Sequence, residues 1–472
     1  MPSIVNQEEL IPTKDVAQPA RGCRTAQRTM PSKLSVRGTR AQARPFSYFD
    51  AFVKTFSDAY KPGENESGYI NLAVAQNVLS AELFHNRLCR AFAEHPSPVS
   101  ATMYDDMKGS RALREAMARH IRRRVCRGDS RAHVVRATDV VLSSGAGAVI
   151  ENLAMCLCDE GDSILIPAPF YPAFPNDLRA RLGVNTVPVH CDEGPANLPS
   201  HSDYDRVVQE EVDFVKCKAI LLSHPGNPTG VVYSARQIRE TIEWAVRRRL
   251  HVISDEIYAC SVFNPNAPHE FVSAILIVED MIQQAVLDGE EAYAQDLKDN
   301  VHVIYGLSKD FCTSGYRVGA LWTRNVDIHR ALDNASYFCA VPGPMQYALA
   351  VVLEDDEFLD AFFNSNRERL YDQYGDFNTH LAPLTEYVVQ PDAAMFVLFS
   401  LRNYLPESNA TFDDEKKLWT HVYDVAKVVL TPGADCASRE PGWFRMCFAA
   451  VDKPTLNVAI QRIINALESF KV

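Results

Sequence analysis

The sequence contains no long apolar run, and none approaches the roughly 18–20 residues that a membrane-spanning helix needs. It has no excess of positive charge either, because 48 Lys and Arg stand against 60 Asp and Glu, for a net charge of −12. This balance gives nucleic-acid binding no support and favours an enzyme of small molecules. The 12 cysteines are scattered, and the closest pair, Cys156 and Cys158, lacks the spacing and neighbouring histidines of a zinc site. We therefore expect no membrane, nucleic-acid or metal partner, and reduced thiols in a cytoplasmic protein.

Acidic residues are also absent from residues 16–49, which carry seven Arg or Lys. An arginine- and serine-bearing segment without acids can be a transit peptide, but Glu8, Glu9 and Asp15 precede this one. We expect residues 1–45 to form a disordered basic arm, with organelle targeting as the alternative.

What the middle of the chain does contain is an alternation of short apolar runs with helical stretches. The runs include Ala219–Leu222, His251–Ile253 and Val301–Tyr305, and a helical stretch covers Ala235–Arg249. This pattern of βαβ units predicts an α/β fold with a mostly parallel sheet between layers of helices. We assign residues 126–335 to this large domain and 336–472 to a smaller C-terminal α/β domain. Residues 46–125 form an N-terminal segment that we expect to contribute to the smaller domain.

Lys309 follows the apolar run Val301–Tyr305 by four residues. A lysine at the end of a buried strand is poorly solvated, which disfavours its ammonium form and suits a Schiff-base nucleophile. Ser308 and Arg317 flank it with the donors that a phosphate dianion requires, and Arg can bind two phosphate oxygens at once. The alternative is an ordinary surface lysine in a loop.

Three further segments come directly after apolar runs. The small residues of Ser143–Ala148 open a helix and suit an anion at its N-terminus; the alternative is a plain turn. Asn227 is placed to donate an amide hydrogen bond, although Asn-Pro is also a turn dipeptide. Asp255 ends a strand, where a buried carboxylate needs a cation such as a protonated pyridine nitrogen; the alternative is a helix N-cap.

Their spacing favours a single site. Asn227 and Asp255 are 28 residues apart, about one strand–helix–strand unit, and Asp255 and Lys309 are 54 apart, about two such units or one with an insertion. Side chains at the carboxyl ends of parallel strands line one crevice. A phosphate cradle, an amide, a carboxylate and a lysine match the phosphate, phenolic oxygen, ring nitrogen and aldehyde of pyridoxal 5′-phosphate.

At these residues the chain resembles the class I/II aminotransferase family of fold-type I pyridoxal-phosphate enzymes, and within it the 1-aminocyclopropane-1-carboxylate (ACC) synthase branch. The resemblance runs from about Tyr69 to the C-terminus. It is carried by Asn71–Leu83, Pro167–Phe174, Gly306–Gly319 and Glu440–Phe448. The resemblance implies a fold with a large cofactor-binding domain and a smaller one, and a homodimer with its sites at the subunit interface.

The resemblance also implies roles for residues around the cofactor ring. Lys309 would form the Schiff base and then move protons, and Asp255 would pair with the pyridine nitrogen. Asn227 and Tyr258 would hydrogen-bond the phenolic oxygen. Tyr171 would stack on the ring, unless it is simply a core aromatic.

Further roles concern the phosphate and the substrate. The phosphate would be held by Ala146, Gly147, Ser308 and Arg317. Arg445 would bind the substrate carboxylate with two hydrogen bonds, unless it is a surface arginine.

Two positions depart from the ACC synthase pattern. Those enzymes have a glutamate, which helps set their preference for S-adenosylmethionine, where this chain has Gln76, so one ion-pair partner for a cationic substrate is missing. They also have a tyrosine two residues before a glycine, where this chain has Met107. Tyr104 instead stands five residues before Gly109, a spacing that many aminotransferases use for a tyrosine that reaches the partner subunit's phosphate. A core or surface tyrosine is the alternative.

We therefore predict a pyridoxal-phosphate-dependent aminotransferase-like enzyme that acts on an amino acid or a derivative of one in small-molecule biosynthesis. The alternative is a lyase of the same group, either a carbon–sulfur lyase or an ACC synthase-like enzyme, because the same residues serve both reactions. A third reading is a non-catalytic binding domain. It is disfavoured by the presence of Lys309, Asp255, Asn227 and Arg445 together.

Overall fold

The computed structural model describes residues 34–210 and 213–470. Its centre is a seven-stranded sheet with the order β2-β8-β7-β6-β5-β3-β4. Within this sheet β8 runs antiparallel to both of its neighbours and the other strands are parallel. The predicted α/β class with a mostly parallel sheet is confirmed. The strands are β2 (Val140–Ser143), β3 (Ser163–Ala168), β4 (Asn185–His190), β5 (Cys217–Ser223), β6 (His251–Asp255), β7 (Val301–Gly306) and β8 (Gly319–Trp322).

Alternating side chains along each strand feed two separate cores. On β5, Ile220 and Leu222 pack into the core on one face, whereas Ala219 and Leu221 pack into the core on the other. Successive strand side chains point to opposite faces, so a strand buried on both sides must be apolar throughout. This explains why these strands read as continuous apolar runs.

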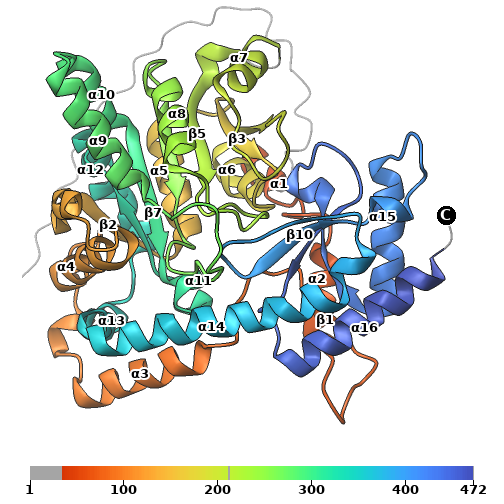
Figure 1. The fold of residues 1–472 in the computed structure, drawn as a ribbon. Helices are drawn as coiled ribbons and strands as arrows, with labels where there is room; N and C mark the ends of the chain where they lie inside the picture. Colours follow the sequence, from red (N-terminus) through yellow and green to blue (C-terminus); the bar gives the residue numbers. More distant parts are fainter. Residues whose placement is uncertain (1–33, 211–212, 471–472) are drawn as a thin grey trace, which may run out of the picture.

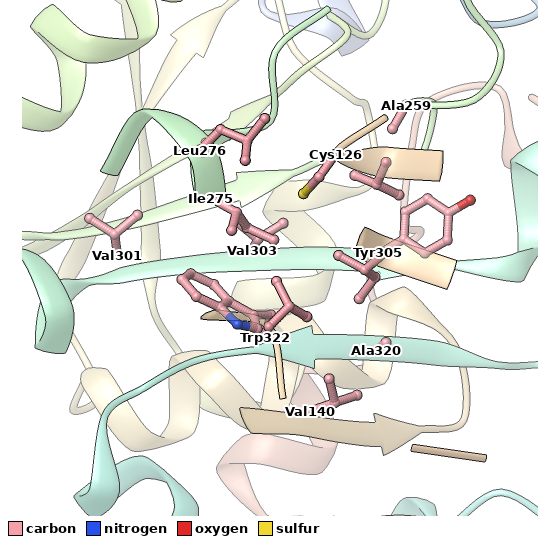
Figure 2. Close-up of a cluster of buried hydrophobic side chains, with 14 of the residues drawn as sticks. Cys126, Val140, Ala259, Ile275, Leu276, Val301, Val303, Tyr305, Ala320 and Trp322 are labelled. Atoms are coloured by element: carbon pink, nitrogen blue, oxygen red, sulfur yellow. The ribbon is translucent and has the colours of Figure 1, made fainter. Parts of the chain in front are cut away.

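Helices cover both faces (Figure 1). The first core receives side chains from α3 (Ala81–Glu94), α4 (Arg111–His120), α8 (Ala235–Val246), α9 (Ala274–Leu287), α10 (Glu291–Asn300) and α13 (Gly343–Glu354). The second receives them from α5 (Ala146–Leu157), α6 (Phe174–Leu182) and α12 (Val326–Ala335). Figure 2 shows part of the first core, where Val303 and Tyr305 of β7 lie near Trp322 of β8.

A second, smaller sheet lies beside the first (Figure 1). Its order is β12-β13-β10-β9 and its strands are antiparallel. The strands are β9 (Tyr387–Val389), β10 (Phe396–Ser400), β12 (Thr431–Pro432) and β13 (Trp443–Cys447), and a parallel pair joins β1 (Ile70–Asn71) to β11 (Val428–Val429). The helices around it are α14 (Asp356–His380), α15 (Phe412–His421) and α16 (Lys453–Ser469), and α14 is long enough to run along both parts of the molecule.

Residues 34–125 divide between the two parts. β1 pairs with β11 and contributes Ile70 to the core of the smaller sheet. By contrast, α3 and α4 bury Phe84 and Leu113 in a core of the large sheet. The predicted segment therefore serves the smaller domain only in its first part, because the apolar faces of these two helices pack against α13 and the large sheet.

The expected disordered arm covers residues 1–45, of which 1–33 lie outside the described residues. The remainder departs from the expectation, because residues 36–40 form helix α1 (Val36–Arg40). Arg40 forms an ion pair with Glu160 at 2.7 Å and lies against the end of α6. The other short helices are α2 (Phe49–Ser57), α7 (His201–Glu210) and α11 (Leu307–Asp310).

The described part of the chain, residues 34–210 and 213–470, contains neither a single long apolar helix nor a cluster of metal-binding side chains. No single helix there has the length and apolar composition to cross a membrane, although the pair Val326–Cys339 and Gly343–Glu354, bent by 112°, passes that test by length and composition only. No group of three or more His, Cys, Asp or Glu side chains is arranged there to hold a metal ion.

Candidate active site

Lys309 lies in α11, which begins where the fully buried strand β7 ends. Its ammonium group is enclosed and donates a hydrogen bond to the carbonyl oxygen of Ala75, from the N-terminal side of the chain. Burial lowers the pKa of Lys309 to about 8, because an enclosed ammonium ion loses its hydration. About a tenth of the amine is therefore neutral at pH 7, far more than for a solvated lysine, and the neutral form is the one that acts as a nucleophile.

Asp255 is the last residue of β6, the strand beside β7. Its carboxylate is 7% exposed and accepts a hydrogen bond from the backbone N–H of Ile257 at 3.3 Å. Burial raises its pKa from 3.8 to about 7, against the opposing effects of that hydrogen bond and of Lys309. A carboxyl group in this state is suited to a buried cationic nitrogen.

A cavity of about 220 Å³ lies between these two side chains. Nine residues that the sequence predicts around the cofactor line it together: Ala146, Gly147, Tyr171, Asn227, Asp255, Tyr258, Ser308, Lys309 and Arg317. They come from the ends of five strands of the large sheet, β2, β3, β5, β6 and β7, and from the helices and loops that follow them. The geometry thus brings the separate sequence segments to one place.

One end of the cavity is built for an anion. Helix α5 begins at Ala146 after Gly145, whose φ of +94° favours glycine. A Cβ at Gly145 would lie 2.3 Å from Nη2 of Arg317, so the guanidinium packs directly on the turn. Arg317 donates from Nη1 to the carbonyl of Ser314 at 2.8 Å. Its remaining donors and the helix N-terminus fit a phosphate group.

Next to the lining residue Asn227, Arg445 connects the large sheet to the smaller one. Arg445 on β13 donates from Nη1 to Oδ1 of Asn227 at 2.9 Å and from Nη2 to Oγ1 of Thr431 at 3.1 Å. The side chain is buried, and its Nε has no hydrogen-bond partner among the described residues. Because Oδ1 of Asn227 is already an acceptor, the amide nitrogen of Asn227 is the atom left to donate into the cavity. Arg445 itself is not part of the lining.

Two further predicted residues, Tyr104 and Gln76, are not part of the cavity lining. Tyr104 follows the 3₁₀ segment η1 (Val99–Thr102) and is 86% exposed. Gln76 is exposed, and its backbone carbonyl accepts a hydrogen bond from Sγ of Cys447 at 3.3 Å. Within the described residues of a single chain, neither side chain lines the site.

Other residues of the site were missed by sequence reasoning. Asp177 on α6 lines the same cavity as Asp255, and burial raises its pKa from 3.8 to about 7, with Glu151 and Asp255 acting in the same direction. Ile150, Ile257 and Ser314 complete the lining. Asp177 stands six residues after Tyr171 in a charged helical turn. In the sequence alone it cannot be distinguished from a carboxylate that is exposed to solvent.

The comparisons with known proteins agree with this geometry. The fold is shared with aspartate aminotransferase from Thermus thermophilus, with a TM-score of 0.71 at 21% identity over 92% of this chain and 100% of that one. It is also shared with aspartate aminotransferase from Thermotoga maritima, with a TM-score of 0.68 at 24% identity over 92% and 100% of the two chains.

Sequence similarity identifies the family to which the chain belongs. Residues 67–463 match the family model "Aminotransferase class I and II". The chain is 32% identical to 1-aminocyclopropane-1-carboxylate synthase 4 of Oryza sativa subsp. japonica over 96% of its length and 92% of that protein. It is 31% identical to 1-aminocyclopropane-1-carboxylate synthase 7 of Arabidopsis thaliana, over 92% and 94%. The chain belongs to the class I and II aminotransferase family, whose enzymes use pyridoxal 5′-phosphate, and the predicted resemblance is confirmed.

Proposed function

We propose that this chain is a pyridoxal-phosphate-dependent aminotransferase that acts on an amino acid or a derivative of one, with Lys309 as its catalytic residue. The observation that carries the proposal is the single cavity that Lys309, Asp255 and Arg317 share. An amine, a carboxylate and a phosphate-binding guanidinium match the three ends of this cofactor. When bound, the cofactor supplies an aldehyde for the amino group and an electron-withdrawing ring.

The residues around the cofactor site have separate roles. Lys309 supplies the amine that holds the cofactor and, with its pKa near 8, takes and returns a proton at the substrate's α-carbon. Asp255 keeps a proton on the ring nitrogen, which maintains the ring's pull on electrons. Tyr171, Asn227 and Tyr258 line the same cavity, where Tyr171 would cover the ring and the other two would donate hydrogen bonds to its phenolic oxygen.

Substrate orientation depends on Arg445. Its guanidinium is anchored by Asn227 and Thr431, and its unpartnered Nε leaves a donor for a carboxylate. Binding one carboxylate of the substrate here places the α-carbon toward Lys309, which is electrostatically coupled to Arg445. The side chain is enclosed in this structure, so a substrate carboxylate replaces part of its present contacts.

Elimination is the second candidate reaction, and the curated relatives quoted above favour it, since both are named as ACC synthases. The exposed amide at Gln76 argues for a different preference, because it offers no negative charge to a cationic substrate. The residues around the cofactor are compatible with either outcome. The fate of the nitrogen distinguishes three outcomes: transamination keeps it on the cofactor, elimination from an S-substituted cysteine releases it as ammonia, and formation of 1-aminocyclopropane-1-carboxylate leaves it on the product.

The experiment is to incubate the purified enzyme with single amino acids and S-substituted cysteines and to assay keto acids and ammonia. Under our proposal, a keto acid forms from an amino acid in amounts that depend on an added keto-acid acceptor, without free ammonia. Pyruvate or a thiol together with ammonia would establish a lyase instead. Lys309→Ala serves as the control and should be inactive in either assay.

We also propose that the chain acts as a homodimer, as members of this family typically do. The support is an exposed apolar patch that we define by Val99, Met103, Tyr104, Tyr337 and Phe338. Its exposure reaches 84% at Phe338 and 86% at Tyr104. The two parts of the patch adjoin, because Gly343, five residues after Phe338, lies against Ala101. Such a patch marks an interface, and a second copy would bring Tyr104 toward the neighbouring cofactor site.

A further inference from the structure

A second cavity, of about 450 Å³, lies behind the candidate active site and shares no lining residue with it. The segment after β6 separates the two, because Tyr258 lines the first cavity whereas Ala259 and Cys260 line the second. The second cavity is cationic, although the chain as a whole carries a net charge of −12. Its charged lining consists of Arg123, Arg124, Arg127, Arg367 and Asp360.

The carboxylates around this cavity neutralise its arginines only in part. Asp360 binds Arg124 at 2.5 Å and lies 3.8 Å from Arg123, so one acid serves two cations. Arg123 and Arg124 also share Asp356. Arg127 pairs with Glu270, whose side chain is 71% exposed. The lining itself holds four guanidinium groups and one carboxylate, which leaves an excess of positive charge in a concave site.

Arg367 is the least neutralised of the four arginines that line this cavity. It donates from Nη2 to Oδ1 of Asn364 at 2.5 Å, and it has no carboxylate within 4.0 Å among residues 34–210 and 213–470. Burial raises the pKa of Cys260, and the charges of Arg367 and Arg124 both oppose that rise. Arg367 from α14 and Arg124 therefore act on the same wall of the cavity from different sides.

The backbone that presents the other arginines is unusual. Residues Ile121–Val125 form the π-helical turn η2, closed by a hydrogen bond from the N–H of Cys126 to the carbonyl of Ile121 at 2.8 Å. Arg127 follows with φ +53°, in the left-handed region that a non-glycine residue rarely adopts. π-Helical turns are rare and occur often at functional sites. Here Arg123 and Arg124 lie within the turn and line the cavity.

We propose that this cavity binds a small polyanion of the phosphate class, held by Arg123, Arg124, Arg127 and Arg367. A guanidinium binds two phosphate oxygens at once, and several of them around one cavity match a ligand with more than one negative charge. The mutual repulsion of the four cations falls when the anion enters. The site is distinct from the phosphate cradle at Arg317, because no residue belongs to both linings.

The test is calorimetric titration of inorganic pyrophosphate into the enzyme saturated with pyridoxal phosphate, so that the cradle at Arg317 is filled. We expect one site per chain at about physiological ionic strength. Arg367→Gln and Arg123→Gln should each weaken binding by about tenfold or more, since each removes charge-assisted hydrogen bonds. The affinity of Arg367→Lys for pyrophosphate should lie between those of the wild type and Arg367→Gln. Lysine keeps the positive charge but cannot form two parallel hydrogen bonds.

The matched control is Arg330→Gln, which changes a side chain that is 76% exposed, is ion-paired to Asp327 and lies outside the lining. It should bind pyrophosphate within about twofold of the wild type, a change smaller than that from one lost hydrogen bond. Thermal unfolding without ligand checks that each variant is folded. Absence of binding at millimolar pyrophosphate would overturn the proposal, as would equal affinity in the wild type and the three variants of the cavity arginines. Citrate binding as tightly as pyrophosphate would overturn the phosphate assignment.

Discussion

Asp255 is buried and Lys309 is half-buried with an enclosed ammonium group, and burial displaces the pKa of each toward the uncharged form. Buried ionisable groups destabilise a fold unless an opposite charge lies beside them. Asp255 ends β6 and Lys309 follows the neighbouring strand β7, and both line one cavity. The cost of burying them is therefore a physical signature of a site that is completed by a cofactor.

One prediction follows for Asp255 in the cofactor-free protein. The folded-state pKa, about 7, is above the ordinary 3.8, so the folded state holds the proton more tightly. Stability from this group is fully present below pH 3.8 and is lost as the pH rises through 7. Asp255→Asn should therefore stabilise the cofactor-free protein at pH 8 by on the order of 2 kcal/mol. The difference in unfolding free energy between Asp255→Asn and the wild type, measured by chemical denaturation, should become smaller toward pH 4.

The matched control is Asp327→Asn, which changes a side chain that is 82% exposed and should show no such pH dependence. With cofactor bound, the sign should reverse and Asp255→Asn should be the less stable and less active protein. Equal stability of wild type and Asp255→Asn across this pH range would show that the carboxyl group is not buried as described.

A second prediction concerns the pH at which cofactor is taken up. Only the neutral amine of Lys309 attacks an aldehyde, and burial lowers its pKa from 10.5 to about 8. The rate of colour development on adding pyridoxal phosphate to cofactor-free protein should rise with pH and level off above about 8. A rate that keeps rising toward pH 10 would mean that the reacting lysine is a solvated one.

At the scale of elements, strand β13 aligns the substrate side of the site. Side chains two residues apart share one face of a strand, so Arg445 and Cys447 point the same way. Arg445 stands opposite Leu398 of β10, and both Arg445 and Cys447 are coupled electrostatically to Lys309. The smaller sheet thus presents this face to the end of β7, and its position relative to the large sheet sets the room for a substrate.

The corresponding prediction is that Arg445→Lys raises the KM of every substrate with an α-carboxylate by about tenfold or more, since a two-pronged hydrogen bond is lost. Arg330→Gln, on the exposed face of α12, should leave KM unchanged. Steady-state kinetics with several amino acids measure this. An unchanged KM in Arg445→Lys would remove Arg445 from substrate binding.

Most residues of the candidate site could be predicted from the sequence, because each is placed by the strand that directly precedes it. Asn227, Asp255 and Lys309 each follow an apolar strand, and parallel strands bring their carboxyl ends to one edge. Asp177 could not be found in this way, because it lies on a helix whose orientation depends on packing. Nor could the association of α3 and α4 with the large sheet, since an amphipathic helix does not encode which core it covers.

At the scale of the whole molecule, the described single chain leaves Tyr104 and Phe338 exposed together. A dimer would bury them and would have a mass of about 106 kDa, twice 52.8 kDa. The role of Tyr104 could not be read from one chain, because its predicted target belongs to the partner.

We therefore predict that Phe338→Glu shifts the protein from dimer toward monomer in light scattering after gel filtration. It should also weaken the binding of pyridoxal phosphate, since Tyr104 then no longer reaches the neighbouring site. Leu287→Glu provides the control, because this side chain is 81% exposed on α9, away from the patch. A monomeric wild-type protein with full cofactor affinity would contradict the dimer.

The central claim is that Lys309 carries the cofactor, and borohydride reduction of the purified protein followed by peptide mass spectrometry tests it most directly. We predict a single pyridoxyl-phosphate adduct, on Lys309, and its complete loss in Lys309→Ala together with the yellow colour. An adduct on another lysine, or none after incubation with excess pyridoxal phosphate, would contradict the account.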